Sequence, residues 1–275
     1  MEHAAAESPA ERAPVAPRLK PWQRELARQL GIVLAGAAAY GLVNSLIFHL
    51  DPPDTLNRLG VANARRVVDL ERWLHVFREA DFYAFITGHA LLRLAVDAVY
   101  VWLHLPLFIM LAIWLYVARR RLYLLTRNAV LISGAIALAC EFWPVAPPYL
   151  VPGLHFANTA AGRVYDAVEP KTLFDVYGAV PSIHVAWSLL IGLALVRGTR
   201  SLWLRAAGIA LPIAMAVAVT ATGNHYFFDS FAGVLAAAAG LWLGAWLQRR
   251  RERGSAGVRY AERAPGDTGH DGAAR

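Results

Sequence analysis

Composition sets this chain apart from ordinary soluble domains. Of its 275 residues, 57% are hydrophobic and only 17% are charged, whereas soluble domains carry about 25% charged residues. The hydrophobic residues gather in long blocks, which indicates a polytopic membrane protein. The formal net charge is +7, but the arginines lie in short runs beside the apolar blocks, which indicates membrane orientation rather than nucleic-acid binding. With Cys140 as its one cysteine, the chain excludes an intrachain disulfide.

Both ends of the chain are polar. Residues 1–25 are rich in Ala, Pro, Glu and Arg, and residues 249–275 in Gly, Arg, Asp and Ala. Neither end has apolar periodicity, and the first has no apolar stretch of the kind that a signal peptide requires. We predict two disordered cytoplasmic tails around one membrane domain at 26–248.

Six apolar segments predict the fold of this domain. A helix needs about 20 residues to cross the hydrocarbon, and the third and fourth segments are slightly short. The sequence therefore predicts an all-α bundle of six transmembrane helices, at about 26–50, 97–118, 128–145, 181–196, 202–222 and 226–247.

The segment at about 61–92, between the first two spans, has a different pattern. Its apolar residues recur at spacings of three and four, with charged residues between them. This pattern predicts an amphipathic helix that lies at the membrane interface rather than crossing. Its apolar residues are Val67, Leu70, Leu74 and Phe77.

Four basic clusters predict the orientation. They lie at 12–28, 119–127, 197–205 and 249–253. Six spans place all four on one side of the membrane, which the positive-inside rule assigns to the cytoplasm. The loops 146–180 and 223–225 then lie on the extracytoplasmic face, which suits a bacterial plasma-membrane protein with both termini inside.

A first histidine motif, GAVPSIH, occupies residues 178–184. Pro181 suits the first position of a helix. Free backbone N–H groups there, together with the Ser182 hydroxyl, would form a phosphate cradle, with His184 in the first turn. The alternative is a helix start whose polar residues simply meet water.

A second motif, GNHYFFD, occupies residues 223–229. His225 and Asp229 are four residues apart, so on a helix they share one face. The carboxylate can hold one imidazole nitrogen as a donor and leave the other free to attack phosphorus, and a helix start also favours an anionic substrate. The alternatives are a packing hydrogen bond or two metal ligands.

Together these motifs resemble those of the type 2 phosphatidic acid phosphatase superfamily. The wider phrases YGAVPSIHVAWS at 177–188 and GNHY at 223–226 are similar to the inositol phosphorylceramide synthase branch, and FWPVAPPY at 142–149 resembles its proline-rich first motif. The resemblance implies a six-helix phosphotransferase that needs no metal or other cofactor. Its substrate would be a membrane lipid, and its acceptor would be water, a small alcohol or a lipid. The sequence does not indicate an oligomeric state.

The resemblance also implies roles for individual residues. His225 would be the nucleophile, Asp229 would orient it, and His184 would protonate the leaving group and then activate the acceptor. Tyr100 and His104 either line the cavity or form an interhelical hydrogen bond. The candidates for substrate contact are Ser182, Gly178, Pro148, Tyr149, Asn224, Tyr100, His104 and Lys171.

The chain departs from the superfamily pattern in its cations. The pattern places a Lys and an Arg in the first motif and an Arg six residues before the catalytic His, where this chain has Val219. After the two prolines it offers Tyr149. A site short of cations stabilises a dianion poorly, which favours a phosphodiester over a monoester. In the outer loop, Arg163 and Lys171 either supply the missing charge or are solvated.

Three readings remain open at this point. Transfer of a phospho-head group to an alcohol is favoured by the branch resemblance, and hydrolysis of a lipid phosphate is the alternative. A proton-relay transporter is disfavoured because both histidines lie at one face rather than at mid-membrane. Glu141, near the end of the third span, either faces the site or hydrogen-bonds at the interface.

Overall fold

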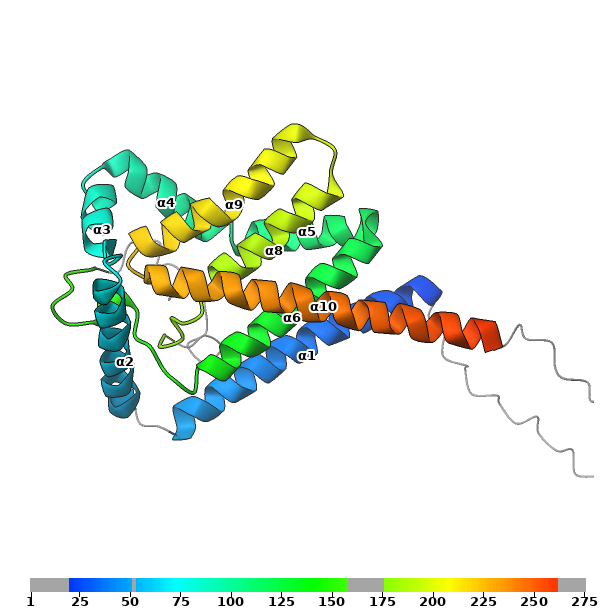
Figure 1. The fold of residues 1–275 in the computed structure, drawn as a ribbon, viewed down its shortest axis with the longest axis horizontal. Helices are drawn as coiled ribbons and strands as arrows, with labels where there is room; N and C mark the ends of the chain where they lie inside the picture. The colour runs from blue at the N-terminus through cyan, green and yellow to red at the C-terminus, as the bar shows by residue number, and fades with distance from the viewer. Residues whose placement is uncertain (1–19, 51–52, 158–175, 262–275) are drawn as a thin grey trace, which may run out of the picture. The chain divides into compact units, whose positions relative to one another are not determined.

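The structure is a computed structural model that describes residues 20–50, 53–157 and 176–261. Within these ranges it is all-helical, as predicted, and has no strand (Figure 1). The elements are α1 (Pro21–Leu50), α2 (Pro53–Trp73), α3 (Glu79–Thr87), α4 (Ala90–Trp102), α5 (Leu105–Ala118), α6 (Arg120–Cys140), the 3₁₀ helix η1 (Pro148–Leu150), α8 (Ile183–Gly198), α9 (Leu202–Ala221) and α10 (Phe227–Ala261).

Contacts divide the chain into residues 1–38 and 39–275. The described part of the first unit is Lys20 and the start of α1. α10 runs on to Ala261, past the predicted domain boundary at 248. The rest of both predicted tails, residues 1–19 and 262–275, lies outside the described residues.

Several helices are built to cross a membrane. α1, α6, α9 and α10 are long and apolar enough, and the pair α3–α4, bent by 111°, is a fifth candidate. α5 and α8 are apolar but shorter. The chain is therefore an integral membrane protein, with four or five candidate spans by length where the sequence predicted six.

The predicted second span, 97–118, is broken in the structure. α4 ends at Trp102, and α5 begins at Leu105 with Pro106 in its first turn. Proline has no backbone N–H and clashes with the carbonyl four residues earlier, so a continuous helix is unfavourable here. The break places His104 at the start of α5, where its ring is buried.

The predicted amphipathic helix at 61–92 is also divided. It comprises most of α2, a turn in which His75 has φ 61°, then α3 and the start of α4. Of the predicted apolar stripe, Val67 is buried within the protein, whereas Leu70 and Leu74 are exposed. The buried face of α2 has helical spacing, but its last buried residue is a carboxylic acid, Glu71.

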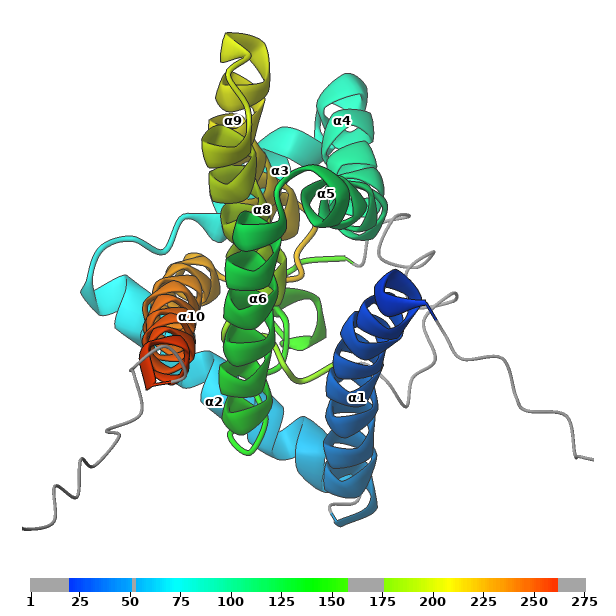
Figure 2. The same ribbon diagram turned by 90° about the vertical axis from the view of Figure 1, so that its right-hand side faces the viewer.

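α8 is central to the packing, since it contacts α5, α6, α9 and α10 (Figures 1 and 2). Small residues allow close approach between these helices. A Cβ on Gly192 of α8 would lie 2.2 Å from the Gly208 oxygen of α9, and one on Gly233 of α10 would lie 2.4 Å from the Ser182 oxygen.

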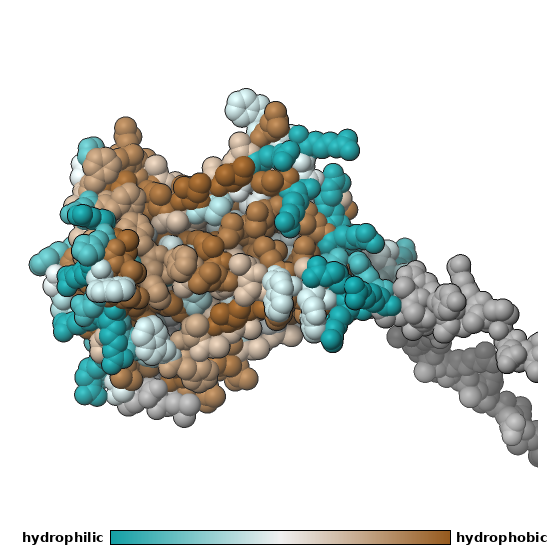
Figure 3. Space-filling model, viewed as in Figure 1, coloured by the Kyte–Doolittle hydropathy of each residue, from teal (hydrophilic) through white to brown (hydrophobic). Residues whose placement is uncertain are grey.

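Basic residues hold three chain segments together at one end of the helices. Arg119 Nε donates to the Gly198 carbonyl at 2.9 Å, and Arg121 lies 3.9 Å from Glu252. The α5–α6 turn, the α8–α9 turn and the later part of α10 therefore meet. On the face in Figure 3, hydrophobic side chains separate this end from hydrophilic ones over α2 and α3. Each histidine motif contains the start of its helix, α8 or α10, so both motifs lie at the end away from the arginines.

Substituting Gly233 by alanine tests the close approach of α10 to the start of α8. Alanine favours a helix interior by up to about 1 kcal/mol over glycine, but at 233 its Cβ would collide with backbone. We expect Gly233→Ala to lower the unfolding temperature in detergent. Gly134→Ala in α6 is the control, since outside its own helix the atom nearest to the added Cβ, on the Trp187 ring, would be 3.8 Å away, and it should leave the temperature unchanged or raise it. Equal behaviour of the two variants would contradict this packing.

Candidate active site

Three histidines from separate parts of the chain come together. His104 precedes α5, His184 lies in the first turn of α8, and His225 lies in the turn before α10. The ring centroids of His184 and His225 are 5.7 Å apart, and those of His104 and His184 are 4.2 Å apart. The Tyr100 ring stacks on His184 at 5.1 Å. The structure thus groups four of the predicted site residues, with Tyr100, His104 and His225 each beside the His184 ring.

The His225 ring has a defined orientation. Its Nδ1 lies 2.9 Å from the Ala179 carbonyl oxygen and 3.2 Å from Asp229 Oδ2. A nitrogen beside two acceptors carries the proton, so in the neutral ring Nε2 holds the lone pair. The predicted partners therefore meet, but across a turn rather than along a helix face, because His225 precedes α10.

The start of α10 is occupied by carboxyl groups of the chain itself. The N–H groups of Tyr226, Phe227 and Phe228 donate to Asp229 Oδ2, Glu79 Oε1 and Glu71 Oε1, at 2.9, 2.9 and 2.7 Å. The bond from the Tyr226 N–H to Asp229 is therefore one of the two hydrogen bonds of a capping box. The expectation that this helix start attracts a substrate anion was wrong, because these three donors are already bound.

The first motif lies directly against α10. α8 begins at Ile183 with Ser182 as its N-cap, so Pro181 precedes the helix instead of opening it as predicted. Ser182 is fully buried, its hydroxyl accepts from the Val185 N–H at 3.5 Å, and its own N–H donates to the Asp229 carbonyl at 3.0 Å. The two histidine motifs thus share backbone hydrogen bonds.

The proline-rich segment 142–149 joins both motifs. Val145 forms a parallel bridge with Gly178, in the first motif. Tyr149 donates its N–H to the carbonyl of Gly223 at 3.2 Å, and the Tyr226 hydroxyl donates to the Ala146 carbonyl at 3.2 Å. Pro148, beside Tyr149 in η1, is buried. Three motifs that are distant in the sequence therefore form one structure.

The turn before His225 closes on the end of α9. Asn224 and His225 both donate their N–H groups to the Val219 carbonyl, each at 3.1 Å, and Asn224 Nδ2 donates to Thr222 Oγ1 at 2.8 Å. The Val219 side chain is fully buried in a cluster with Tyr100. The position at which the superfamily pattern has an arginine is therefore part of an apolar core.

Other predicted residues differ in their outcome. Lys171 and Arg163 lie outside the described residues. Glu141 accepts a hydrogen bond from the Tyr40 hydroxyl at 2.5 Å, which matches the hydrogen-bonding alternative. In the described ranges, no group of three His, Cys, Asp or Glu side chains is arranged to hold a metal ion.

Sequence reasoning missed Glu71 and Glu79. Both are buried, and both bind the first turn of α10. Burial, followed by the hydrogen bond to Glu79 and its charge, raises the pKa of Glu71 to about 9. The available signal was the position of Glu71 four residues after Val67 on the buried face of α2, where a carboxyl group requires a partner.

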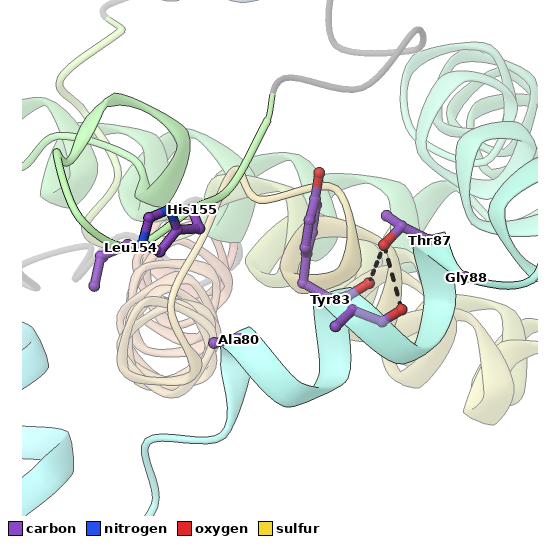
Figure 4. A pocket seen from close by; sticks show the side chains of 7 residues that line it. Ala80, Tyr83, Thr87, Gly88, Leu154 and His155 are labelled. Carbon is purple, nitrogen blue, oxygen red and sulfur yellow. Dashed lines mark hydrogen bonds between the residues drawn. The ribbon is translucent and has the colours of Figure 1, made fainter.

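A hollow of about 450 Å³ lies elsewhere, beside α3 (Figure 4). The Thr87 hydroxyl on its wall donates to the Tyr83 and Ala84 carbonyls of the same helix. No predicted site residue lines it. Its lining consists of Ala80, Tyr83, Ala84, Thr87, Gly88, Leu154 and His155.

Comparison with known families agrees with the site. The sequence model of the PAP2 superfamily matches residues 65–243, which is more than half of the chain and includes both histidine motifs. The chain belongs to the PAP2 superfamily. It is therefore a membrane enzyme of the phosphatase or phosphotransferase type. No curated protein and no solved structure matches the chain.

Asparagine at 229 tests the carboxylate of this PAP2 site. Asp229→Asn keeps an oxygen that can accept from the Tyr226 N–H, but it removes the charge beside His225 Nδ1. We expect the fold to persist and turnover to fall by about 10²–10⁴-fold, the usual worth of acid–base assistance. Circular dichroism and initial rates in detergent measure the two effects. Unchanged turnover would show that Asp229 does not assist His225.

Proposed function

We propose that this PAP2 protein transfers a phospho-head group, of the inositol-phosphate type, from a donor lipid to a lipid alcohol through a phosphohistidine on His225. The observation that carries the proposal is the His225 ring, whose Nδ1 is held by Asp229 and the Ala179 carbonyl beside the ring of His184. Membership of the superfamily favours this chemistry over a proton-relay transporter.

In the first step, Nε2 of His225 attacks the phosphorus of the donor. An N–P bond forms, and the P–O bond to the leaving lipid alcohol breaks. His184 gives its proton to the departing oxygen. The positive charge that develops on the His225 ring is stabilised by Asp229, which accepts from Nδ1.

In the second step, His184 takes the proton of the acceptor hydroxyl. The acceptor oxygen attacks phosphorus, the N–P bond breaks, and His225 is regenerated. Water and a lipid alcohol compete for this step, so transfer requires an acceptor site that excludes water. Tyr100 and His104, both buried beside His184, are our candidates for its wall.

Charge favours a phosphodiester donor over a monoester. Val219 is apolar and buried, and the first-turn N–H groups of α10 are bound by carboxyl groups. The His225 ring contacts the Ala179 carbonyl, Asp229 and the His184 ring, none of which is a cationic group of lysine or arginine. A dianion without paired charge is costly in such surroundings, and a monoanion costs less. Ser182, Gly178, Asn224 and Lys171 remain candidates for substrate contact.

The same proposal includes an orientation. We place the arginine-rich end in the cytoplasm, following the positive-inside rule, with both termini inside and the histidines on the extracytoplasmic side. This orientation requires six crossings. The broken pair α4 and α5 would then form one crossing together, and the short α8 would form another. The mutual contacts of the arginine-bearing segments support a single basic face.

Alanine substitutions separate the two histidines. Without His225 there is no nucleophile, so His225→Ala should abolish both turnover and labelling by a donor with a radioactive phosphorus. Without His184 the intermediate can form but decays slowly, so His184→Ala should reduce turnover by about 10²–10⁴-fold and retain acid-labile label. Electrophoresis after a detergent quench at alkaline pH, in which phosphohistidine is stable, measures the label. Normal turnover in His225→Ala would refute the phosphohistidine.

Donor choice separates transfer from hydrolysis. With phosphatidylinositol and a lipid alcohol, we expect a new inositol phospholipid, formed faster than phosphate is released from phosphatidic acid, because the diester carries one negative charge less. Mass spectrometry detects the product, and His225→Ala is the control. Rapid phosphate release from phosphatidic acid or a polyprenyl phosphate, with no capture by any alcohol, would instead establish a lipid phosphate phosphatase.

A further inference from the structure

Two glutamic acids from outside the histidine motifs meet at the first turn of α10. Glu71 comes from α2 and Glu79 from α3, and they accept from the adjacent N–H groups of Phe228 and Phe227 at 2.7 and 2.9 Å. Their relative exposures are 1% and 0%. Figure 1 shows the start of α10 beside α2 and α3.

The remaining oxygens of the two side chains require a proton. Glu71 Oε2 and Glu79 Oε2 are buried with no hydrogen-bond partner of fixed donor type among the described residues. The two carboxyl groups bind adjacent N–H groups of α10 and are therefore neighbours, and two neighbouring carboxyl groups can hydrogen-bond to each other only if one is protonated. A single shared proton satisfies both oxygens and leaves one negative charge at the helix start, where it is favourable.

We propose that Glu71 and Glu79 share one proton and act as positioning residues that hold the first turn of α10, and with it His225 and Asp229, in the reactive geometry. Glu79 and Glu71 bind the N–H groups of residues 227 and 228. These lie between the Tyr226 N–H, which the Asp229 side chain binds, and Asp229 itself. We call the hydrogen bonds from Phe227 and Phe228 to Glu79 and Glu71 the carboxyl clamp. Loss of this clamp would free the turn that carries His225 and Asp229. The catalytic part of this inference rests on the function proposed above, whereas the shared proton does not.

Alkaline pH acts against the clamp. A second negative charge on the pair is repelled by the first charge and by Asp229. Since the folded pKa of Glu71 is raised, its contribution to stability is fully present below 4.5 and is lost as the pH rises through about 9. The other charged groups of these helix ends form exposed pairs, Asp69 with Arg72 and Arg78 with Asp81.

Glutamine is the decisive substitution, because it resembles a permanently protonated glutamic acid. In Glu71→Gln the amide oxygen can accept from the Phe228 N–H while the amide nitrogen donates to Glu79. We expect this variant to keep most of the turnover and to lose the alkaline fall in rate and stability. Glu71→Ala removes the clamp and should lower kcat by about 10²-fold, the scale of a 1 Å misplacement, with KM unchanged. Asp69→Asn on the exposed face of α2 is the matched control and should change neither.

The experiment measures the full chain in detergent in two ways. Infrared difference spectra report the C=O stretch of a protonated carboxyl group independently of turnover, and this band should weaken in both Glu71→Gln and Glu79→Gln at neutral pH. The second measurement is the rate of transfer from phosphatidylinositol to a lipid alcohol between about pH 6 and 10, the window set by the raised pKa of Glu71. Unfolding temperatures are measured over the same pH range.

Each outcome bears on one proposal. No turnover by the wild-type chain with any donor refutes the proposed function, while the infrared band still decides the shared proton. A band unaffected by either glutamine variant overturns the shared proton. An alkaline fall that persists in Glu71→Gln, or a loss of kcat in Glu71→Gln as large as in Glu71→Ala, overturns the positioning role.

Discussion

The site depends on how the first turn of α10 is held. Three consecutive backbone N–H groups each donate to a different carboxyl group, and one of these, Asp229, also holds His225. Backbone donors at a helix start have no partner within the helix, so in an apolar bundle they must find one elsewhere. The chain satisfies them with side chains from α2, α3 and α10. As a result, the orientation of the proposed nucleophile is coupled to helices that precede the first histidine motif by about a hundred residues.

Much of this arrangement could be predicted from local sequence. Apolar blocks predict an all-helical membrane protein, and the histidine phrases predict the superfamily, which the comparison confirmed, as well as a narrower branch, which it did not. The contact between His225 and Asp229 was expected from their spacing, although the structure makes it across a turn. The bounds of α9 also matched, because Ser201 and Gly223 mark its two ends clearly.

What could not be predicted depends on contacts between distant segments. The periodicity places Glu71 among the polar residues of an amphipathic helix, because it cannot distinguish a solvated carboxylate from one that caps another helix. Val67, Leu70 and Leu74 have helical spacing, but Val67 packs inside the protein whereas Leu70 and Leu74 are exposed, and spacing alone does not separate residues that pack on protein from residues that face lipid. Pro106 lies within an apolar block, and hydropathy alone does not reveal the helix break there that places His104 in the site.

The short length of α8 has a consequence for the lipid itself. Its 16 residues extend about 24 Å at 1.5 Å per residue, whereas the hydrocarbon layer is about 30 Å thick. If Gly198 lies at one hydrocarbon boundary, then His184, 14 residues earlier and so about 21 Å away, lies about 9 Å below the opposite one, and any tilt increases this depth. A donor phosphate must then descend beneath its neighbours' headgroups, or the bilayer must thin around the protein. Hydrophobic mismatch would thus make turnover sensitive to acyl-chain length, so that thinner bilayers bring the phosphate to the histidines at lower cost.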